Sequence, residues 1–166
     1  MTASDERTQV WKAIPEFSSY EASDGQPDGR GEIRSVDRTL AGGRRCKGRV
    51  LALRLSTRGY PQVNLTDDDG IRQTREVHAL QMAAFEGPCP PGRQVRHWND
   101  IPTDNRWAPG GEANCGPGKP GNLVYGTPKQ QWDDKLRNVP APLATRRHWS
   151  RRVTDYVGSL LRRRSR

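Results

Sequence analysis

The sequence has few apolar residues and no long apolar run. Hydrophobic residues make up 32% of its 166 positions, against about 45–50% in ordinary soluble domains on a slightly different count. No apolar run approaches the roughly 20 residues that a transmembrane helix needs, which argues against a protein of that kind. Glycine and proline are frequent, with 17 and 13 residues. We therefore expect a thin core and many turns rather than a large helical bundle or sheet.

Paired cysteines and an export signal are also lacking. Three cysteines, Cys46, Cys89 and Cys115, lie far apart, and none belongs to a Cys-x-x-Cys pair. This spacing disfavours a structural zinc site and favours reduced thiols. The first residues, MTASDERTQVW, are polar and charged, unlike the apolar stretch of a secretory signal. We expect a cytoplasmic protein.

The excess positive charge is concentrated in the C-terminal part of the chain. The net charge is +9, and residues 135–166 hold ten Lys or Arg and one acid, which leaves 18 basic and 18 acidic residues before them. Such a segment is typical of an arm that binds a polyanion, because each cation that neutralises a phosphate releases a counterion. A solvated tail is the alternative interpretation. An apolar stripe in this segment leaves two helical forms open, one packed on the protein with arginines facing phosphate and one lying on a membrane.

The N-terminal part of the sequence predicts short β-strands separated by turns. A hairpin turn is expected at Asp69-Gly70. The acidic run at 67–70 resembles the start of a calcium loop, but the remaining ligand spacing and the closing Glu are missing, so a solvated turn is favoured. The expected strands are residues 32–36, 49–54, 60–65 and 71–77.

The part that follows predicts a helix, two apolar extended segments and a second helix. The first helix begins at VHALQMAAF and ends at Gly87, and a strand is expected over 94–98. The second helix begins after NLVYG, where Thr127 can be the N-cap, Pro128 fits the first helical position and Gln130 completes a capping box. One face of the first helix carries apolar side chains: Val77, Leu80, Ala84 and Phe85.

A histidine at the end of the expected strand and the amides after it suggest phosphodiester chemistry. Hydrolysis of a phosphodiester requires a base that activates water and a cation that neutralises charge on the phosphate. A neutral histidine such as His97 can be the base if an acceptor, for example an asparagine carbonyl, holds its other ring nitrogen. A hard divalent cation would take oxygen ligands from the following helix and from the phosphate.

Two stretches carry this pattern, VHALQMAAFEGPCPPGRQVRHWNDIPTDNRW and GNLVYGTPKQQWDD, with the order H…DNR…NLVYGT. They resemble the HNH endonucleases of phages and mobile introns. Upstream, WKAIPEFSSYEASDG, GEIRSVDR, KGRVLAL and GYPQVNL resemble the small module that commonly precedes such domains, with QPDGRG as an insertion. The resemblance covers about residues 10–138, and the order of its two parts makes it more specific than either part. Characteristic positions of the module are Trp11, Ile14, Tyr20, Ser23 and Gly25.

The resemblance implies an α+β fold with three parts. These are a small N-terminal β-rich module over residues 10–75, a ββα-metal (HNH) finger over 76–138, and a linker with a basic amphipathic helix over 139–166. The implied function is a metal-dependent DNA endonuclease that nicks or cuts double-stranded DNA in a bacterial host or a phage-infected cell. A DNA-binding protein on a catalytically impaired HNH scaffold is the alternative. A basic protein of the membrane surface or the ribosome is a third interpretation, but it explains only the tail.

The resemblance also assigns roles to individual residues. It makes His97 the general base and Asn122 the amide that orients this base and ties the loop. One Mg²⁺ or Mn²⁺ ion is implied, with Gln131 as a ligand where relatives usually have Asn or His. Many relatives place a metal-binding Asp or His before the base, whereas this chain has Arg96, which we expect to hold the substrate phosphate. The missing carboxylate would then come from Asp100, Asp104 or Asp134.

Other polar and aromatic residues have more than one interpretation. For His78, at the start of a helix, a packing or capping role and a functional role are both open. The tryptophans Trp98, Trp107 and Trp132 are expected to be core residues rather than platforms for bases. Further DNA contacts are expected from the tail, at Arg146, Arg147, Arg151, Arg152, Arg162 and Arg163.

Overall fold

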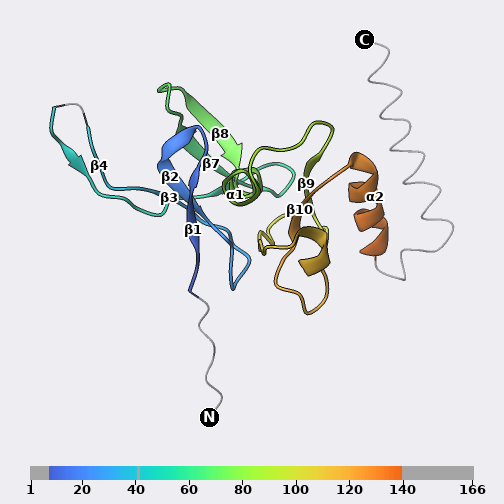
Figure 1. Ribbon diagram of the computed structural model, residues 1–166. Helices are drawn as coiled ribbons and strands as arrows, with labels where there is room; N and C mark the ends of the chain where they lie inside the picture. Colours follow the sequence, from blue (N-terminus) through green and yellow to red (C-terminus); the bar gives the residue numbers. More distant parts are fainter. Residues whose placement is uncertain (1–7, 41, 140–166) are drawn as a thin grey trace, which may run out of the picture.

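The structure is a computed structural model, and it describes residues 8–40 and 42–139. The expected basic helix and its six arginines lie outside these residues, so their contacts with DNA stay predictions. The described chain consists of small antiparallel sheets and two α-helices (Figure 1). The predicted α+β class is confirmed.

Two three-stranded antiparallel sheets make up most of the N-terminal part. The first has the order β1-β2-β3, with strands Trp11–Ile14, Phe17–Ser23 and Ile33–Ser35. The second has the order β6-β7-β8, with strands Arg54–Leu55, Pro61–Thr66 and Arg72–Glu76. Two short strands form an arm that projects from the body (Figure 1), β4 (Arg38–Thr39) and β5 (Arg45–Cys46).

The predicted strands of this part are found except for one. The hairpin of β7 and β8 is confirmed, and its turn contains Gly70 with a φ of 84°. The strand expected over 49–54 is wrong in its bounds, because Val50 makes only an isolated bridge to Arg34 and β6 begins at the last residue of the range. The side chains of Val50 and Leu53 are 52% and 36% exposed, so no buried face holds these residues in a longer strand.

A thin core joins both sheets to the helix α1 (Val77–Glu86). Buried and more exposed positions alternate along β7, as a strand with one covered face requires. The helix contacts strands of both sheets and also β9 and β10, so it lies between the N-terminal sheets and the C-terminal part (Figure 1). The core cluster consists of Ile14, Phe17, Tyr20, Ala22, Ile33, Val63, Leu65, Val77 and Leu80.

The C-terminal part is a strand pair followed by a helix. Its elements are β9 (Gln94–His97), β10 (Leu123–Gly126) and α2 (Pro128–Arg137), with a short 3₁₀ helix (Gly111–Asn114) in the loop between the strands. The strands are antiparallel, and α2 packs on β9. The predicted start of α2 is confirmed, because the Thr127 side chain accepts from the amide of Gln130 and the Gln130 side chain accepts from the amide of Thr127. Among residues 8–40 and 42–139, no helix is long and apolar enough to cross a membrane.

Candidate active site

His97, the last residue of β9, has a defined protonation pattern. Its side chain is buried, and its Nε2 atom lies 3.0 Å from Oδ1 of Asn105. The Nδ2 group of Asn105 donates to the carbonyl of Arg30, so the oxygen of this amide faces His97. An amide oxygen only accepts hydrogen bonds, so Nε2 of His97 carries the hydrogen and Nδ1 carries the lone pair. The ring nitrogen of His97 that is left to accept a proton is therefore Nδ1.

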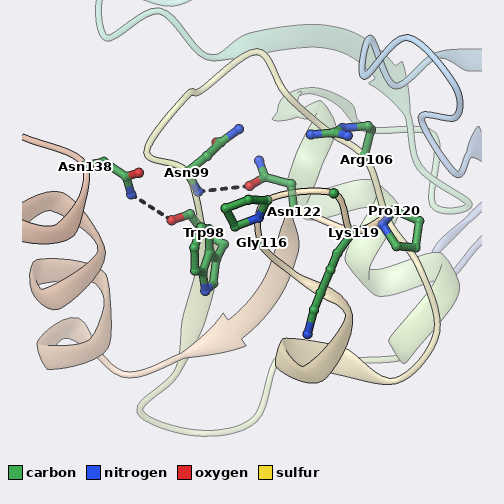
Figure 2. A pocket seen from close by; sticks show the side chains of 11 residues that line it. Trp98, Asn99, Arg106, Gly116, Lys119, Pro120, Asn122 and Asn138 are labelled. Atoms are coloured by element: carbon green, nitrogen blue, oxygen red, sulfur yellow. Dashed lines mark hydrogen bonds between the residues drawn. The ribbon is translucent and has the colours of Figure 1, made fainter.

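Asn122 does not orient His97, and this prediction is wrong. Its Oδ1 atom accepts from the backbone N–H of Asn99 at 2.9 Å (Figure 2), and its Nδ2 group donates to the backbone carbonyl of Asp104 at 2.6 Å. It therefore ties the loop together, as predicted, while Asn105 holds the imidazole. Both asparagines lie in the strings DNR and NLVYG, and their spacing alone did not distinguish them.

The N-terminal module helps to position Asn105. The backbone N–H of Asn105 donates to the backbone carbonyl of Gly29 at 2.7 Å. The backbone carbonyl of Asn105 accepts from the side chain of Gln81 in α1 at 3.1 Å. Gly25 packs so closely that a Cβ atom there would lie 2.2 Å from the carbonyl oxygen of Asn105. The residue that orients His97 is thus held by a loop of the module and by α1.

Two further rings surround His97, and the sequence did not mark them as a group. The centroid of His78, in α1, lies 5.1 Å from that of His97 and 5.1 Å from that of Tyr60. The rings of Tyr60 and His97 are 5.7 Å apart. Glu76, the last residue of β8, lies 3.2 Å from Nε2 of His78. Tyr60, His78 and His97 are far apart in the sequence, so only the fold reveals this cluster of rings.

Burial keeps both imidazoles uncharged at neutral pH. It lowers the pKa of His97 below its usual 6.5, although the hydrogen bond to Asn105 and the charges of Asp104 and Asp100 oppose this effect. Burial lowers the pKa of His78 to about 3, and the charge of a protonated His97 adds to the effect. A neutral His97 has a lone pair available for a proton.

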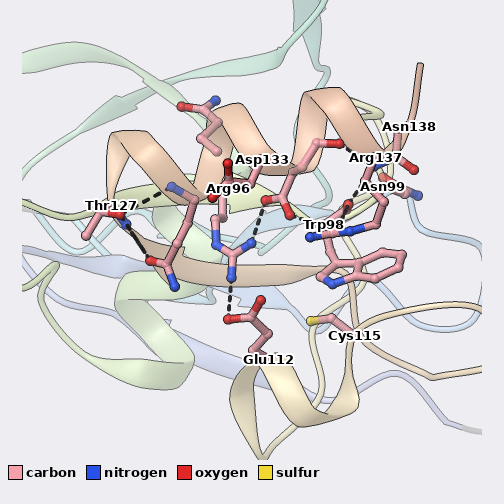
Figure 3. Close-up of polar contacts among 12 residues, drawn as sticks. Arg96, Trp98, Asn99, Glu112, Cys115, Thr127, Asp133, Arg137 and Asn138 are labelled. Carbon is pink, nitrogen blue, oxygen red and sulfur yellow. Dashed lines mark hydrogen bonds and ion pairs between the residues drawn. The ribbon is translucent and has the colours of Figure 1, made fainter. Parts of the chain in front are cut away.

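Arg96 is a buried structural residue, and its predicted contact with phosphate is wrong. Its side chain is 1% exposed, and its Nη1 and Nη2 atoms lie 2.5 Å from Asp134 of α2 and 2.5 Å from Glu112 of the 3₁₀ helix (Figure 3). Successive residues of a strand point to opposite faces, so Arg96 faces α2 while His97 faces α1. The guanidinium links β9 to α2 and to the 3₁₀ helix, and it is not accessible to a substrate.

The predicted metal ligands are not brought together. Asp134 is fully buried and pairs with Arg96 and Arg137. The side-chain oxygen of Gln131 accepts from the Gln94 side chain. Asp100 is close enough to His97 for their charges to interact, and burial raises the pKa of its carboxyl, while Lys135 and His97 lower it.

The remaining predicted carboxylate is also engaged. Asp104 pairs with Arg106 at 2.7 Å and accepts from the side chain of Asn99 at 2.7 Å. Within the described part of the chain, no three His, Cys, Asp or Glu side chains form a group that could hold a metal ion. The predicted ligands therefore do not fit a single metal site in this arrangement, and metal binding stays a prediction.

An open pocket of about 560 Å³ lies beside the loop that Asn122 ties (Figure 2). Arg106 and Lys119 line it, and because Arg106 is paired with Asp104, Lys119 is the residue that gives the pocket its positive charge. Trp98 lies at its wall, where the guanidinium of Arg137 stacks 4.2 Å from the centroid of the indole ring. The pocket is thus a polar, cationic surface next to the candidate active site.

Comparison with known proteins supports the resemblance. Residues 10–66 match the NUMOD4 motif, which is found in homing endonucleases with HNH domains. A solved structure described as DNA binding and cleavage by the HNH homing endonuclease I-HmuI is similar, with a TM-score of 0.53 and 19% sequence identity. The similarity covers 88% of this chain and 66% of that chain, so this chain spans just under two thirds of its length. No curated protein sequence matches the chain.

Proposed function

Because the chain joins a NUMOD4 motif to the fold of an HNH endonuclease, we propose that it is a DNA endonuclease that hydrolyses phosphodiester bonds of double-stranded DNA. The observation that carries this proposal is the pair of His97 and Asn105. The pair leaves Nδ1 of a buried, uncharged imidazole as a base. That is the protonation state that activation of a water molecule requires.

The reaction follows from this arrangement. Nδ1 of His97 takes a proton from water, and the water oxygen forms a bond to phosphorus. The bond from phosphorus to the leaving sugar oxygen breaks, and that oxygen takes up a proton from solvent. The imidazolium that forms keeps its hydrogen bond to Asn105 and is stabilised by the charges of Asp104 and Asp100.

A requirement for Mg²⁺ or Mn²⁺ remains part of the proposal. Asp100 supports it, because its carboxylate makes no hydrogen bond or ion pair with residues 8–40 and 42–139 and lies near His97. Asp134 and Gln131, the other expected ligands, are engaged in contacts inside the protein.

Cationic surfaces on the described chain suit a DNA partner. The arm of β4 and β5 projects from the body (Figure 1) and carries exposed basic side chains. The pocket beside Asn122 adds Lys119. Such side chains fix the register of a protein on the phosphate backbone. Arg44 and Arg45 are exposed basic residues of the arm, and two more, Lys47 and Arg49, follow it in the chain.

A DNA-binding protein without cleavage is the second candidate. Arg96 favours it. The guanidinium of this residue is paired with Asp134 and Glu112, and it occupies the position before His97 where many HNH relatives have a metal-binding Asp or His. The slight exposure of His97, 6%, favours it as well.

Incubation with supercoiled plasmid DNA separates the two candidates. Wild type and His97→Ala are compared with Mg²⁺, with Mn²⁺ and with EDTA, and DNA affinity is measured in parallel. Nicking or linearisation that is lost in His97→Ala supports the endonuclease, and its loss in EDTA establishes the metal. Binding without any cleavage supports the second candidate. A protein that neither cuts nor binds DNA refutes both.

A further inference from the structure

The turn between β6 and β7 brings an aromatic side chain to His97 that the proposed reaction does not use. Tyr60 is the residue before β7, and its ring centroid lies 5.7 Å from that of His97, with an interplanar angle of 44°. The turn lies in the part of the chain that matches the NUMOD4 motif, whereas His97 ends β9. The candidate active site therefore takes a side chain from each part.

Hydrogen bonds within the turn fix the position of Tyr60. The backbone N–H of Ser56 donates to the backbone carbonyl of Tyr60 at 2.8 Å, and the backbone N–H of Tyr60 donates to Oγ of Ser56 at 3.1 Å. The ring also packs against that of His78, with centroids 5.1 Å apart. The backbone and the ring contacts together hold the phenol beside His97.

The hydroxyl group of Tyr60 is available to a ligand. The side chain is partly exposed, and its hydroxyl makes no hydrogen bond with residues 8–40 and 42–139. The hydroxyl of Tyr125, by contrast, donates to the backbone carbonyl of Gly87 at 2.8 Å. A phenol without such a partner can donate to a phosphate oxygen of DNA.

The phenol of Tyr60 stays protonated at neutral pH and is therefore a donor. Burial raises its pKa above the usual 10.0, the charges of Asp100 and Glu76 add to this effect, and that of Arg58 opposes it. The proposed reaction lacks a donor to the phosphate, because Arg96, which was expected to hold this group, is buried and paired inside the protein.

We propose that Tyr60 binds the scissile phosphate, with its hydroxyl donating to an oxygen of that group while His97 takes the proton of the attacking water. The proton of Tyr60 stays on the phenol oxygen throughout. Negative charge develops on the phosphate oxygens in the transition state, and a donor that is already in place stabilises it. This inference rests on the proposed endonuclease function.

Removal of the hydroxyl group alone tests the proposal. Tyr60→Phe keeps the ring contacts, and single-turnover nicking at saturating DNA should fall by roughly 10²-fold. The affinity for DNA, which depends on many phosphate contacts, should change little. Tyr125→Phe is the matched control, because it removes a hydroxyl that is bonded within the protein, and it should leave the nicking rate unchanged.

The pH profile of nicking gives a measurement that a purely structural role of Tyr60 would not move. 3,5-Difluorotyrosine at position 60 keeps the ring and the hydroxyl and lowers the pKa of the phenol. Above that pKa the phenolate cannot donate, and it repels the phosphate. The basic limb of the profile should therefore move to lower pH than in wild type, whereas the same replacement at position 125 should leave it in place.

The outcomes separate this inference from the proposed function. Wild-type nicking rates in Tyr60→Phe, or a basic limb that does not move with difluorotyrosine at position 60, overturn the role of Tyr60 while leaving the endonuclease intact. A wild type that does not cut DNA removes the proposed function, and the inference falls with it. Should Tyr60→Phe fail to fold, the difluorotyrosine profile decides.

Discussion

Gly25 and Asn105 are in contact across 80 positions of sequence: a Cβ atom at Gly25 would lie 2.2 Å from the carbonyl oxygen of Asn105. Asn105 in turn holds His97. The part of the chain that matches the NUMOD4 motif therefore contacts the C-terminal part closely, because its loop helps to position the residue that hydrogen-bonds to His97. A substitution in this loop should therefore change the nicking rate without altering a contact to the substrate.

Gly25→Ala should lower both stability and nicking. Gly25 has a φ of 71°, which costs a residue with a side chain roughly 1–2 kcal/mol. The clash with Asn105 adds about 1–3 kcal/mol as overpacking. Gly70→Ala is the matched control, because Gly70 has a φ of 84° and a Cβ atom there would meet no atom of the described residues within 4 Å. Urea unfolding and plasmid nicking measure the difference, and equal effects of the two substitutions would show that the contact is unimportant.

Arg96→Met should destabilise the fold by about 3–5 kcal/mol, because it leaves the fully buried carboxylate of Asp134 with much less compensation. Lys129→Ala removes an exposed ion pair of the same helix and should cost less than about 1 kcal/mol. Chemical denaturation gives both values. The double variant Arg96→Met with Asp134→Leu should recover part of the loss, and a double variant as unstable as the sum of its single changes would argue against the pairing.

The stability of the protein should fall in acid because of His78. Its pKa is about 3 in the folded chain and 6.5 in the unfolded chain, so between these values the unfolded chain binds more protons. Unfolding free energy therefore decreases as pH falls from 6.5 towards 3, by up to about 1.4 kcal/mol per pH unit from this residue. Denaturation of wild type and His78→Asn at several pH values isolates the contribution. Parallel curves for the two proteins would contradict it.

The basic tail should carry much of the salt dependence of DNA binding. Residues 140–166 contain eight arginines and one acid, and each lost phosphate contact lowers the slope of log affinity against log salt by about 0.9. Affinity titrations at several salt concentrations compare the full chain with a chain that ends at Val139. Equal slopes would mean that the tail makes no phosphate contacts.

Local signals predicted much of the fold. The turn at Asp69-Gly70, the helix from Val77 and the capping box of Thr127 and Gln130 each depend on neighbours within a few residues, and all three are found. These features are set by turn chemistry, periodicity and hydrogen bonds that the sequence displays directly.

The candidate site was less predictable, because the residues that contact each other there are distant in the sequence. The loop between β9 and β10 also shows no periodic pattern of apolar residues. The chain between β9 and β10 contains several asparagines, and only its folded path brings Asn105 rather than Asn122 to His97. The orientation of Arg96 also depended on the elements that cover each face of β9. A buried arginine is stable there only because Asp134 and Glu112 arrive from other segments.

The two asparagines should therefore differ in their effect on the chemistry. Asn105→Ala removes the acceptor of His97 and should lower single-turnover nicking by roughly 10²-fold with DNA affinity retained. Asn105→Asp places a negative charge beside the ring, which favours the protonated imidazole and raises the pKa of His97. The base is then lost at a higher pH, so the acid limb of the rate profile should move upward from its wild-type position below pH 6.5. Asn122→Ala is the control, because it loosens the loop without touching His97 and should leave that limb in place. An acid limb that moves with Asn122 and not with Asn105 would return the orienting role to Asn122.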